Sequence, residues 1–407
     1  MTSKNTDHIQ TTHVGSLPRS EHLLELNKRQ QDGKIAWDDF VSQLHDEVRD
    51  VVKRQIDLGI DIVNDGEYGH VMTQSVDYGG WWNYSFSRLS GLTAGDSDSR
   101  WGAEEPLIES KPGQVRLASF AHRRDRARFK DAYENPVNGV LAARNPVKQP
   151  SITGEITYTG ADAVKADTDG LRTALDELNA NNEGFVAALS PGSAARLTNE
   201  FYDSDEDVVW ACAEALKNEY KAIVDAGFVV QIDDPSIAES WDQIVPEPSV
   251  ADYQKFIQIR IDALNHALEG LPEDKVRFHL CWGSWHGPHT TDLEFKYLVD
   301  QMLTINAGSY SFEAGNVRHA HEWEIWEDTK LPEGKLIVPG VVSHSTNVVE
   351  HPELVAQRIE RFAGLVGREN VIASTDCGFG GRIHPDIAWA KLEALTAGAK
   401  LASQRLF

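Results

Sequence analysis

The chain has 407 residues, 41% of them hydrophobic and 25% charged, which is ordinary for a globular protein with a large core. Its formal net charge of −24 comes without a basic stripe, so we expect no nucleic-acid partner and no anionic membrane partner. Three cysteines are too few for a disulfide framework. With no signal-like N-terminus and no apolar run of about 18 residues, we expect a cytoplasmic protein.

The first third of the chain combines a few regular elements with one irregular stretch. TTHVGSLPR (11–19) precedes helical patterns at 20–32 and 37–58, and the apolar strand IDIVNDGE then ends at Glu67. Residues 80–148 are rich in aromatic residues, glycine and arginine, and we interpret them as a lid-like insertion that covers one face. Its basic stretch HRRDRAR (122–128) is interrupted by an acid, which favours a solvated helix or loop.

From PSITGE (150–155) onward, strand and helix patterns alternate. Strands are predicted at 185–191, 228–235, 275–282, 309–314, 335–342 and 370–377. Helices are predicted from a capping box at 204–207 to Gly227, and at about 250–268, 291–305, 319–329, 352–366 and 385–404. This alternation indicates parallel strands covered by helices.

The alternation predicts an α/β fold, a (β/α)8 TIM barrel that forms one domain over residues 1–407 with the insertion near 80–148. Counting TTHVGS and PSITGE, there are nine candidate strands for eight positions, so one of them lies outside the barrel wall. Polar residues gather at the C-terminal ends of the strands, where such barrels build active sites. They are Glu67, Glu155, Asp233, His279, Cys281, Glu313, His344 and Cys377.

Four of these residues carry the types of ligand that Zn²⁺ takes in tetrahedral geometry. Strand side chains alternate with period two, so His279 and Cys281 face the same way. Alone, this pair is better explained as a core histidine and a small buried cysteine. Together with Glu313 and Cys377, each at another strand end, it predicts a zinc site. Cys212 lies on the apolar face of a helix, and we assign it to the core.

Two carboxylates end other strands. Glu67 and Asp233 either cap loop amides or hold a cationic group such as a substrate ammonium, because an uncompensated buried carboxylate is unfavourable. Asp233 and Asp234 are adjacent and point to opposite faces, and we favour Asp233 for the site.

His344 follows a strand in GVVSHSTN and is either a general acid or a surface-loop histidine. Four tryptophans could stack a planar ligand such as a pterin, or could serve in packing. They are Trp81, Trp82, Trp282 and Trp285.

Taken in order, several motifs resemble the catalytic domain of cobalamin-independent methionine synthase. They are TTHVGSLPR, NDGE, ITGEIT, QIDDPSIAE, HLCWG, SFEAGN, GVVSHSTNVVEHPELVAQRI and STDCGFG, and they span nearly the whole chain except about 85–145. The resemblance implies a barrel of the kind shared with uroporphyrinogen decarboxylase, and zinc on the four ligands named above. It also implies that Gly15, Ser16, Glu67 and Asp233 hold homocysteine, as in methionine biosynthesis.

The sequence departs from the family at two motifs. VSHS replaces DxHS, which leaves the register of His344 open, and QIDDP replaces QIDEP. The wording of EHPELVAQRI and GRENVIASTDCGF is closer to the short branch of the family, which includes epoxyalkane:coenzyme M transferases.

The resemblance predicts a zinc-dependent methyltransferase that moves a methyl group from a 5-methyltetrahydrofolate-type donor to a small-molecule thiol. The alternative is addition of a zinc thiolate to an epoxide, in which arginines hold the far end of the thiol. Arg19 is the first candidate for that role.

Overall fold

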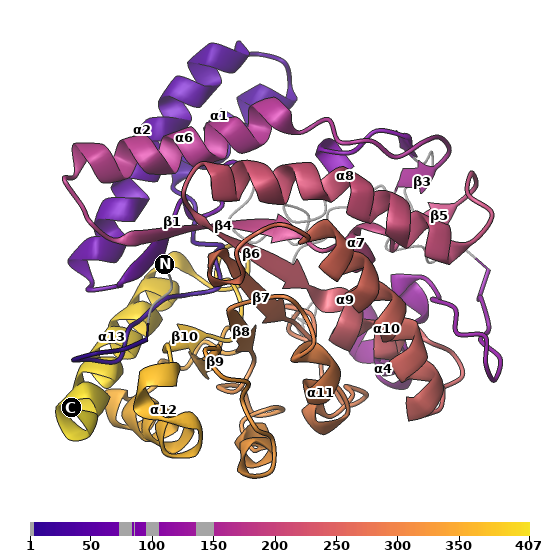
Figure 1. The fold of residues 1–407 in the computed structure, drawn as a ribbon. Helices are drawn as coiled ribbons and strands as arrows, with labels where there is room; N and C mark the ends of the chain where they lie inside the picture. Colours follow the sequence, from indigo (N-terminus) through magenta and orange to yellow (C-terminus); the bar gives the residue numbers. More distant parts are fainter. Residues whose placement is uncertain (1–3, 73–83, 85, 95–105, 136–149) are drawn as a thin grey trace.

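The computed structural model describes residues 4–72, 84, 86–94, 106–135 and 150–407. At its centre is a curled sheet of parallel strands in the order β1-β4-β6-β7-β8-β9-β10, covered on its outer face by long helices (Figure 1). The strands are β1 (Ile62–Asn64), β4 (Glu183–Leu189), β6 (Val229–Asp234), β7 (Val276–Leu280), β8 (Ser309–Phe312), β9 (Leu336–Val342) and β10 (Ser374–Thr375). The predicted α/β class with parallel, helix-covered strands is therefore confirmed.

The N-terminal segment runs beside both edges of this sheet. Thr11 forms a parallel bridge with Ala373, just before β10. The Thr11 carbonyl also accepts hydrogen bonds from the backbone N–H groups of Asp61 and Ile62, both at 3.1 Å. The segment that carries Gly15 and Ser16 thus lies between β10 and β1.

Long helices occupy most of the predicted positions. They are α1 (Glu21–Gln31), α2 (Trp37–Asp57), α6 (Ala161–Glu177), α8 (Asp205–Asp225), α10 (Val250–Ala267), α12 (Pro352–Val366) and α13 (Pro385–Leu406). Serine hydroxyls at positions 20, 204 and 249 accept the backbone N–H three residues on, so α1, α8 and α10 begin at N-cap serines. Among the described residues, no helix combines the length and apolar character needed to cross a membrane.

Short helices fill the connections. They are α4 (Arg124–Arg128), α5 (Lys130–Glu134), α7 (Pro191–Ala194), α9 (Pro235–Ala238), α11 (Val299–Met302), and the 3-10 turns η2 (Phe120–His122), η3 (Glu239–Gln243), η4 (Glu273–Lys275), η5 (Phe295–Tyr297), η6 (Glu322–Glu327) and η7 (Arg368–Asn370).

The predicted helices at 291–305 and 319–329 are wrong, because only η5, α11 and η6 form there. A side chain from elsewhere takes a backbone donor that the first of these helices would need. The N–H of Phe295 donates to Glu322 at 2.6 Å instead of to a carbonyl four residues earlier. Such side-chain to backbone bonds compete with helix formation.

The ninth candidate strand lies outside the central sheet. β3 (Pro150–Ile152) pairs with β2 (Leu92–Ala94) and β5 (Thr198–Asn199) in a small separate sheet. Glu155, just beyond β3, is exposed and therefore does not join the strand-end cluster.

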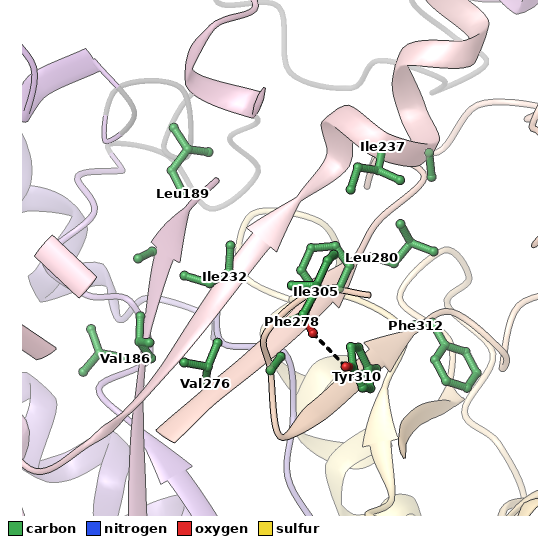
Figure 2. Packing of buried hydrophobic residues seen from close by; sticks show 14 of the residues in the cluster. Val186, Leu189, Ile232, Ile237, Val276, Phe278, Leu280, Ile305, Tyr310 and Phe312 are labelled. Carbon is green, nitrogen blue, oxygen red and sulfur yellow. Dashed lines mark hydrogen bonds between the residues drawn. The ribbon is translucent and has the colours of Figure 1, made fainter. Parts of the chain in front are cut away.

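Alternation along the strands separates two apolar clusters. One face of β4, β6, β7 and β8 packs against the helices, with Val186, Ile232 and Phe278 among the buried residues (Figure 2). The other face contributes a second cluster of Ile62, Phe185, Val229, Leu336, Val338 and Ile372. Along β6, Gln231 and Asp233 follow Val229 on this same face. The second face is therefore apolar at the start of the strands and polar at their C-terminal ends.

Candidate metal centre and substrate cavity

Three of the four predicted zinc ligands come together. The Nδ1 or Nε2 of His279 and the Sγ atoms of Cys281 and Cys377 all lie within 4.8 Å of one another. His279 is in β7, Cys281 directly follows it, and Cys377 follows β10. The two sulfurs are 4.0 Å apart. In a tetrahedral zinc site with Zn–S bonds of about 2.3 Å, two sulfurs lie about 3.8 Å apart.

The imidazole of His279 supports the same assignment. Its Nδ1 is 3.1 Å from the hydroxyl of Ser311 on the neighbouring β8, which fixes the orientation of the ring. Its Nε2 is buried and has no hydrogen-bond partner among the described residues. A buried polar atom without a partner needs an explanation, and a metal ion supplies one. The donor set and its spacing therefore fit zinc.

Glu313, the fourth predicted ligand, has other close neighbours in this structure. Its carboxylate belongs to a second buried group, with His344 and Asp376, whose ligand atoms lie within 4.8 Å of one another. The Glu313 oxygens accept hydrogen bonds from the N–H of Trp282 at 3.0 Å and from the amide of Asn316 at 2.7 Å. Its role as the fourth ligand stays a prediction.

The two thiols of the site differ in acidity. A hydrogen bond from the Cys281 thiol holds the pKa of Cys377 well below its ordinary value. The same bond, with burial, raises the pKa of Cys281. The pair therefore holds one thiolate readily. Cys212 is buried in α8, where desolvation raises its pKa to about 12, consistent with a core residue.

A cavity of about 160 Å³ opens beside these ligands. Glu67 and Asp233 both line it, together with His279, Cys281 and Cys377. Burial, followed by the nearby charge of Glu67, raises the pKa of Asp233 well above its ordinary value. Two carboxylates facing one small cavity make it a favourable place for a cation.

The adjacent acids at the end of β6 have separate tasks. Asp233 faces the cavity and accepts a hydrogen bond from Gln231 at 2.7 Å. Asp234 is fully buried and caps α9, accepting from the N–H of Ser236 at 2.8 Å and from the hydroxyls of Ser236 and Ser193.

The N-terminal segment brings Gly15, Ser16 and Arg19 to the same wall. Ser16 and Arg19 line the cavity, and the Ser16 carbonyl accepts the N–H groups of Phe379 and Gly380. Arg19 donates to the carbonyls of Leu17 at 2.7 Å and Glu67 at 2.5 Å. Its guanidinium thus braces the backbone around Glu67, and a direct role in holding a substrate stays a prediction.

His344 is buried, so its interpretation as a surface-loop residue is wrong. Burial lowers its pKa to about 3, and the ring is neutral at pH 7. It belongs with Glu313 and Asp376 and is not among the described residues that line the cavity. Its role as a general acid stays a prediction.

The tryptophans divide between packing and the cavity. Trp282 is buried, donates to the carbonyl of Leu293 at 2.9 Å and packs on the ring of His319. Trp285 lines the cavity. Trp81 and Trp82 lie outside the described residues.

The sequence interpretation missed an arginine-rich wall of the cavity. Arg123, Arg126 and Arg196 line it together with Glu239. Arg123 and Asp125 are buried, so the prediction of a solvated segment at 122–128 is wrong. Glu239 had a signal, because it follows the strand-end acids within the same QIDDPSIAE motif. No sequence signal pointed to the arginines, because their partners are distant in the chain.

The family model for the catalytic domain of cobalamin-independent synthase matches residues 9–80 and 135–400. The chain belongs to this family. The resemblance drawn from the motifs is thereby confirmed, and with it a methyltransferase type of enzyme.

Relatives within the family match this chain along most of their length. The methionine synthase of Sulfolobus acidocaldarius is 24% identical, over 98% of this chain and 93% of that protein. The uncharacterized protein YxjH of Bacillus subtilis is also 24% identical, over 93% of this chain and 91% of its own. The structure of a B12-independent methionine synthase from Shewanella sp. W3-18-1, in complex with selenomethionine, superimposes with a TM-score of 0.68. At 20% identity over 98% of this chain and 99% of that one, it shows the shared fold.

Proposed function

We propose that this protein is a zinc-dependent S-methyltransferase that methylates homocysteine or a related amino-acid thiol, with a donor of the 5-methyltetrahydrofolate type. The observation that carries the proposal is the placement of a buried His279–Cys281–Cys377 donor set and the Glu67–Asp233 carboxylates around one cavity. The first set suits a thiol-binding metal, and the second suits the ammonium group of the same small molecule.

The proposal includes a closed (β/α)8 barrel that forms one domain. The bonds from Thr11 to Ala373 and Ile62 support the N-terminal segment as the eighth strand. Phe120, Arg123 and Tyr133, all from the predicted insertion, line the cavity and support a lid-like role.

Zinc held by His279, Cys281 and Cys377, with Glu313 as fourth ligand, would keep a substrate thiol deprotonated at neutral pH. Glu67 and Asp233 then hold the ammonium end of the substrate and fix its direction. The N–H of Trp282 and the amide of Asn316 donate to the Glu313 carboxylate and would hold it in place without the metal.

Methyl transfer breaks the bond from the methyl carbon to the donor nitrogen and forms a carbon–sulfur bond. The leaving nitrogen then needs a proton. His344 is our candidate for holding that proton at Nδ1, which is buried and has no hydrogen-bond partner among the described residues. Because burial lowers the pKa of His344 to about 3, the ring is neutral in this structure, and a proton would have to reach it from solvent before it could pass to the leaving nitrogen.

Zinc analysis tests the site. The purified protein should contain about one zinc per chain, and Cys377→Ser should lose it while Cys212→Ser keeps it. Zinc retained without Cys377 contradicts the proposal. The function is tested by adding homocysteine or coenzyme M and measuring proton release, since a thiol that binds as thiolate releases its proton. Release with homocysteine alone supports the amino-acid thiol.

The alternative is addition of a zinc thiolate to an epoxide by an enzyme that uses a sulfonate-bearing thiol. One observation favours it, because the cavity contains the arginine wall described above. Proton release with coenzyme M alone would establish this alternative.

A further inference from the structure

The arginine wall contains one guanidinium whose position is fixed by its neighbours but whose hydrogen-bond donors are not all paired. Arg123 precedes α4 in the predicted insertion, is 94% buried and lines the cavity. Its guanidinium carbon lies 4.0 Å from the ring centroid of Trp285 and 4.6 Å from that of Phe120. These stacking contacts orient a planar cation and leave its edges for hydrogen bonds.

The anionic partner of Arg123 is shared. Glu239 forms an ion pair with Arg123 through Oε1 and with Arg196 through Oε2, the latter at 2.9 Å. Within this trio, two positive charges face one negative charge. The Nε of Arg123 is buried and has no hydrogen-bond partner among the described residues. Leaving such a donor unsatisfied is unfavourable.

Other carboxylates near Arg123 are engaged elsewhere. Asp125 accepts hydrogen bonds from the backbone of Thr290 and the hydroxyl of Tyr133. Asp242 accepts from the backbone N–H of Asp125 and from Thr291. Asp292 contacts two histidines, His289 and His319. Burial lowers the pKa of Arg123, and the charges of these three carboxylates oppose that effect without accepting a hydrogen bond from its guanidinium.

The arginine pair also lies next to the thiol site. A Cβ on Gly283 would stand 3.1 Å from the carboxyl carbon of Glu239, and the N–H of Gly283 donates to the sulfur of Cys281 at 3.2 Å. The side chain of Glu239 therefore passes directly beside the backbone that holds a zinc-ligand candidate. A group bound at Arg123 is within reach of a small molecule whose sulfur or methyl group is at the metal.

We propose that Arg123, supported by Arg196 and Glu239, forms an oxyanion subsite of the cavity that binds a carboxylate, sulfonate or phosphate group of a substrate. The subsite rests on the proposed function and adds to it a second pole, opposite in charge to Glu67 and Asp233. A guanidinium matches the planar, two-oxygen geometry of these groups.

Sulfate is the probe for the subsite itself. Calorimetric titration of the zinc-loaded protein with sulfate should show binding that Arg123→Gln weakens at least tenfold. Arg124→Gln is the matched control, because Arg124 pairs with the exposed Glu247 and is not among the described residues that line the cavity. Unchanged sulfate affinity in Arg123→Gln overturns the proposal, including the case in which sulfate binds only the metal.

A second variant keeps the test decisive if Arg123→Gln fails to fold. Glu239→Gln removes the internal competitor for both arginines while keeping the side-chain shape. Sulfate should then bind several-fold more tightly, and weaker or equal binding overturns the subsite.

Substrate probes identify the source of the oxyanion. If Arg123→Gln weakens homocysteine but not 3-aminopropane-1-thiol, which lacks the carboxylate, the oxyanion belongs to the thiol. If both thiols bind as before and the KM for the methyl donor rises, it belongs to the donor. Zinc content and proton release on adding homocysteine are measured on the same variant. If the wild-type protein binds no zinc and releases no proton, the proposed function is contradicted. If Arg123→Gln keeps zinc, proton release and unaltered sulfate binding, only the subsite is contradicted.

Discussion

The carboxylate of Glu67 lies against the bare Cα of Gly15, so closely that a Cβ at position 15 would stand 2.2 Å from Oε1. Both residues have positive φ, +129° for Gly15 and +56° for Glu67. The N–H of Glu67 donates to Asp65 at 3.0 Å, which stabilises this turn. The position of one cavity carboxylate thus depends on the absence of a side chain fifty residues earlier in the chain.

Gly15→Ala should therefore displace the Glu67 carboxylate and weaken homocysteine binding by about tenfold or more. The added methyl also meets an unfavourable backbone conformation, with a cost to stability of about 1–2 kcal/mol. Binding is measured by calorimetry on the zinc-loaded protein. Gly270→Ala is the matched control, because Gly270 has φ +83° but nothing within 4 Å of an added Cβ. Equal binding losses in the two variants would contradict the contact argument.

The two acids that end β6 should separate binding from stability. Asp233→Ala is expected to abolish most homocysteine binding and to change the free energy of unfolding by less than about 1 kcal/mol. Asp234→Ala removes the buried N-cap of α9 and leaves two serine hydroxyls without their acceptor. It should therefore destabilise the protein by about 2–4 kcal/mol. Denaturant unfolding and calorimetry check both. A stable Asp234→Ala protein with impaired binding would reverse the assignment.

Removal of the metal should expose one cysteine to alkylation. At pH 7, iodoacetamide is expected to label Cys377 first in metal-free protein, because hydrogen bonding from Cys281 lowers the pKa of Cys377. Cys212 is the internal control, since burial raises its pKa to about 12. Peptide mass spectrometry measures the rates, and zinc should protect the reactive residue. Labelling of Cys212 at a similar rate would be inconsistent with the site.

Stability at high pH should depend on His319. Burial alone lowers its pKa, but hydrogen bonds to Asp292 and Glu322 outweigh burial and raise the pKa to about 10. Because the folded pKa exceeds the unfolded value near 6.5, the stabilisation is complete below pH 6.5 and disappears as the pH rises through 10. Denaturant unfolding of the wild type and His319→Gln should differ by roughly 3–5 kcal/mol at pH 6 and converge near pH 11. A difference that stays constant with pH would contradict this assignment.

Strand ends were the part of the site that could be predicted from the sequence. In β6 and β7, apolar runs with period-two alternation determine which residues share a face, and this was enough to choose Asp233 over Asp234 and to pair His279 with Cys281. These residues can be predicted because parallel strands place their C-terminal residues at the same edge of the sheet, whatever their neighbours are.

The arginine wall could not be predicted in the same way. Arg123 contacts Glu239 at a separation of 116 residues, and local charge pattern carries no information about so distant a partner. The same reason explains the wrong helix at 291–305. Glu322 accepts the N–H of Phe295 from outside this segment, and a helical periodicity cannot reveal such a competing acceptor.

The spacing of the two candidate cysteine ligands bears on when the proposed zinc site can form. Cys281 and Cys377 are 96 residues apart in the chain but 4.0 Å apart in space. A chain emerging from the ribosome therefore has no complete donor set until its last strand has been made and paired. If the proposed zinc binds here, an incomplete or misfolded chain would lack the paired cysteines that hold it.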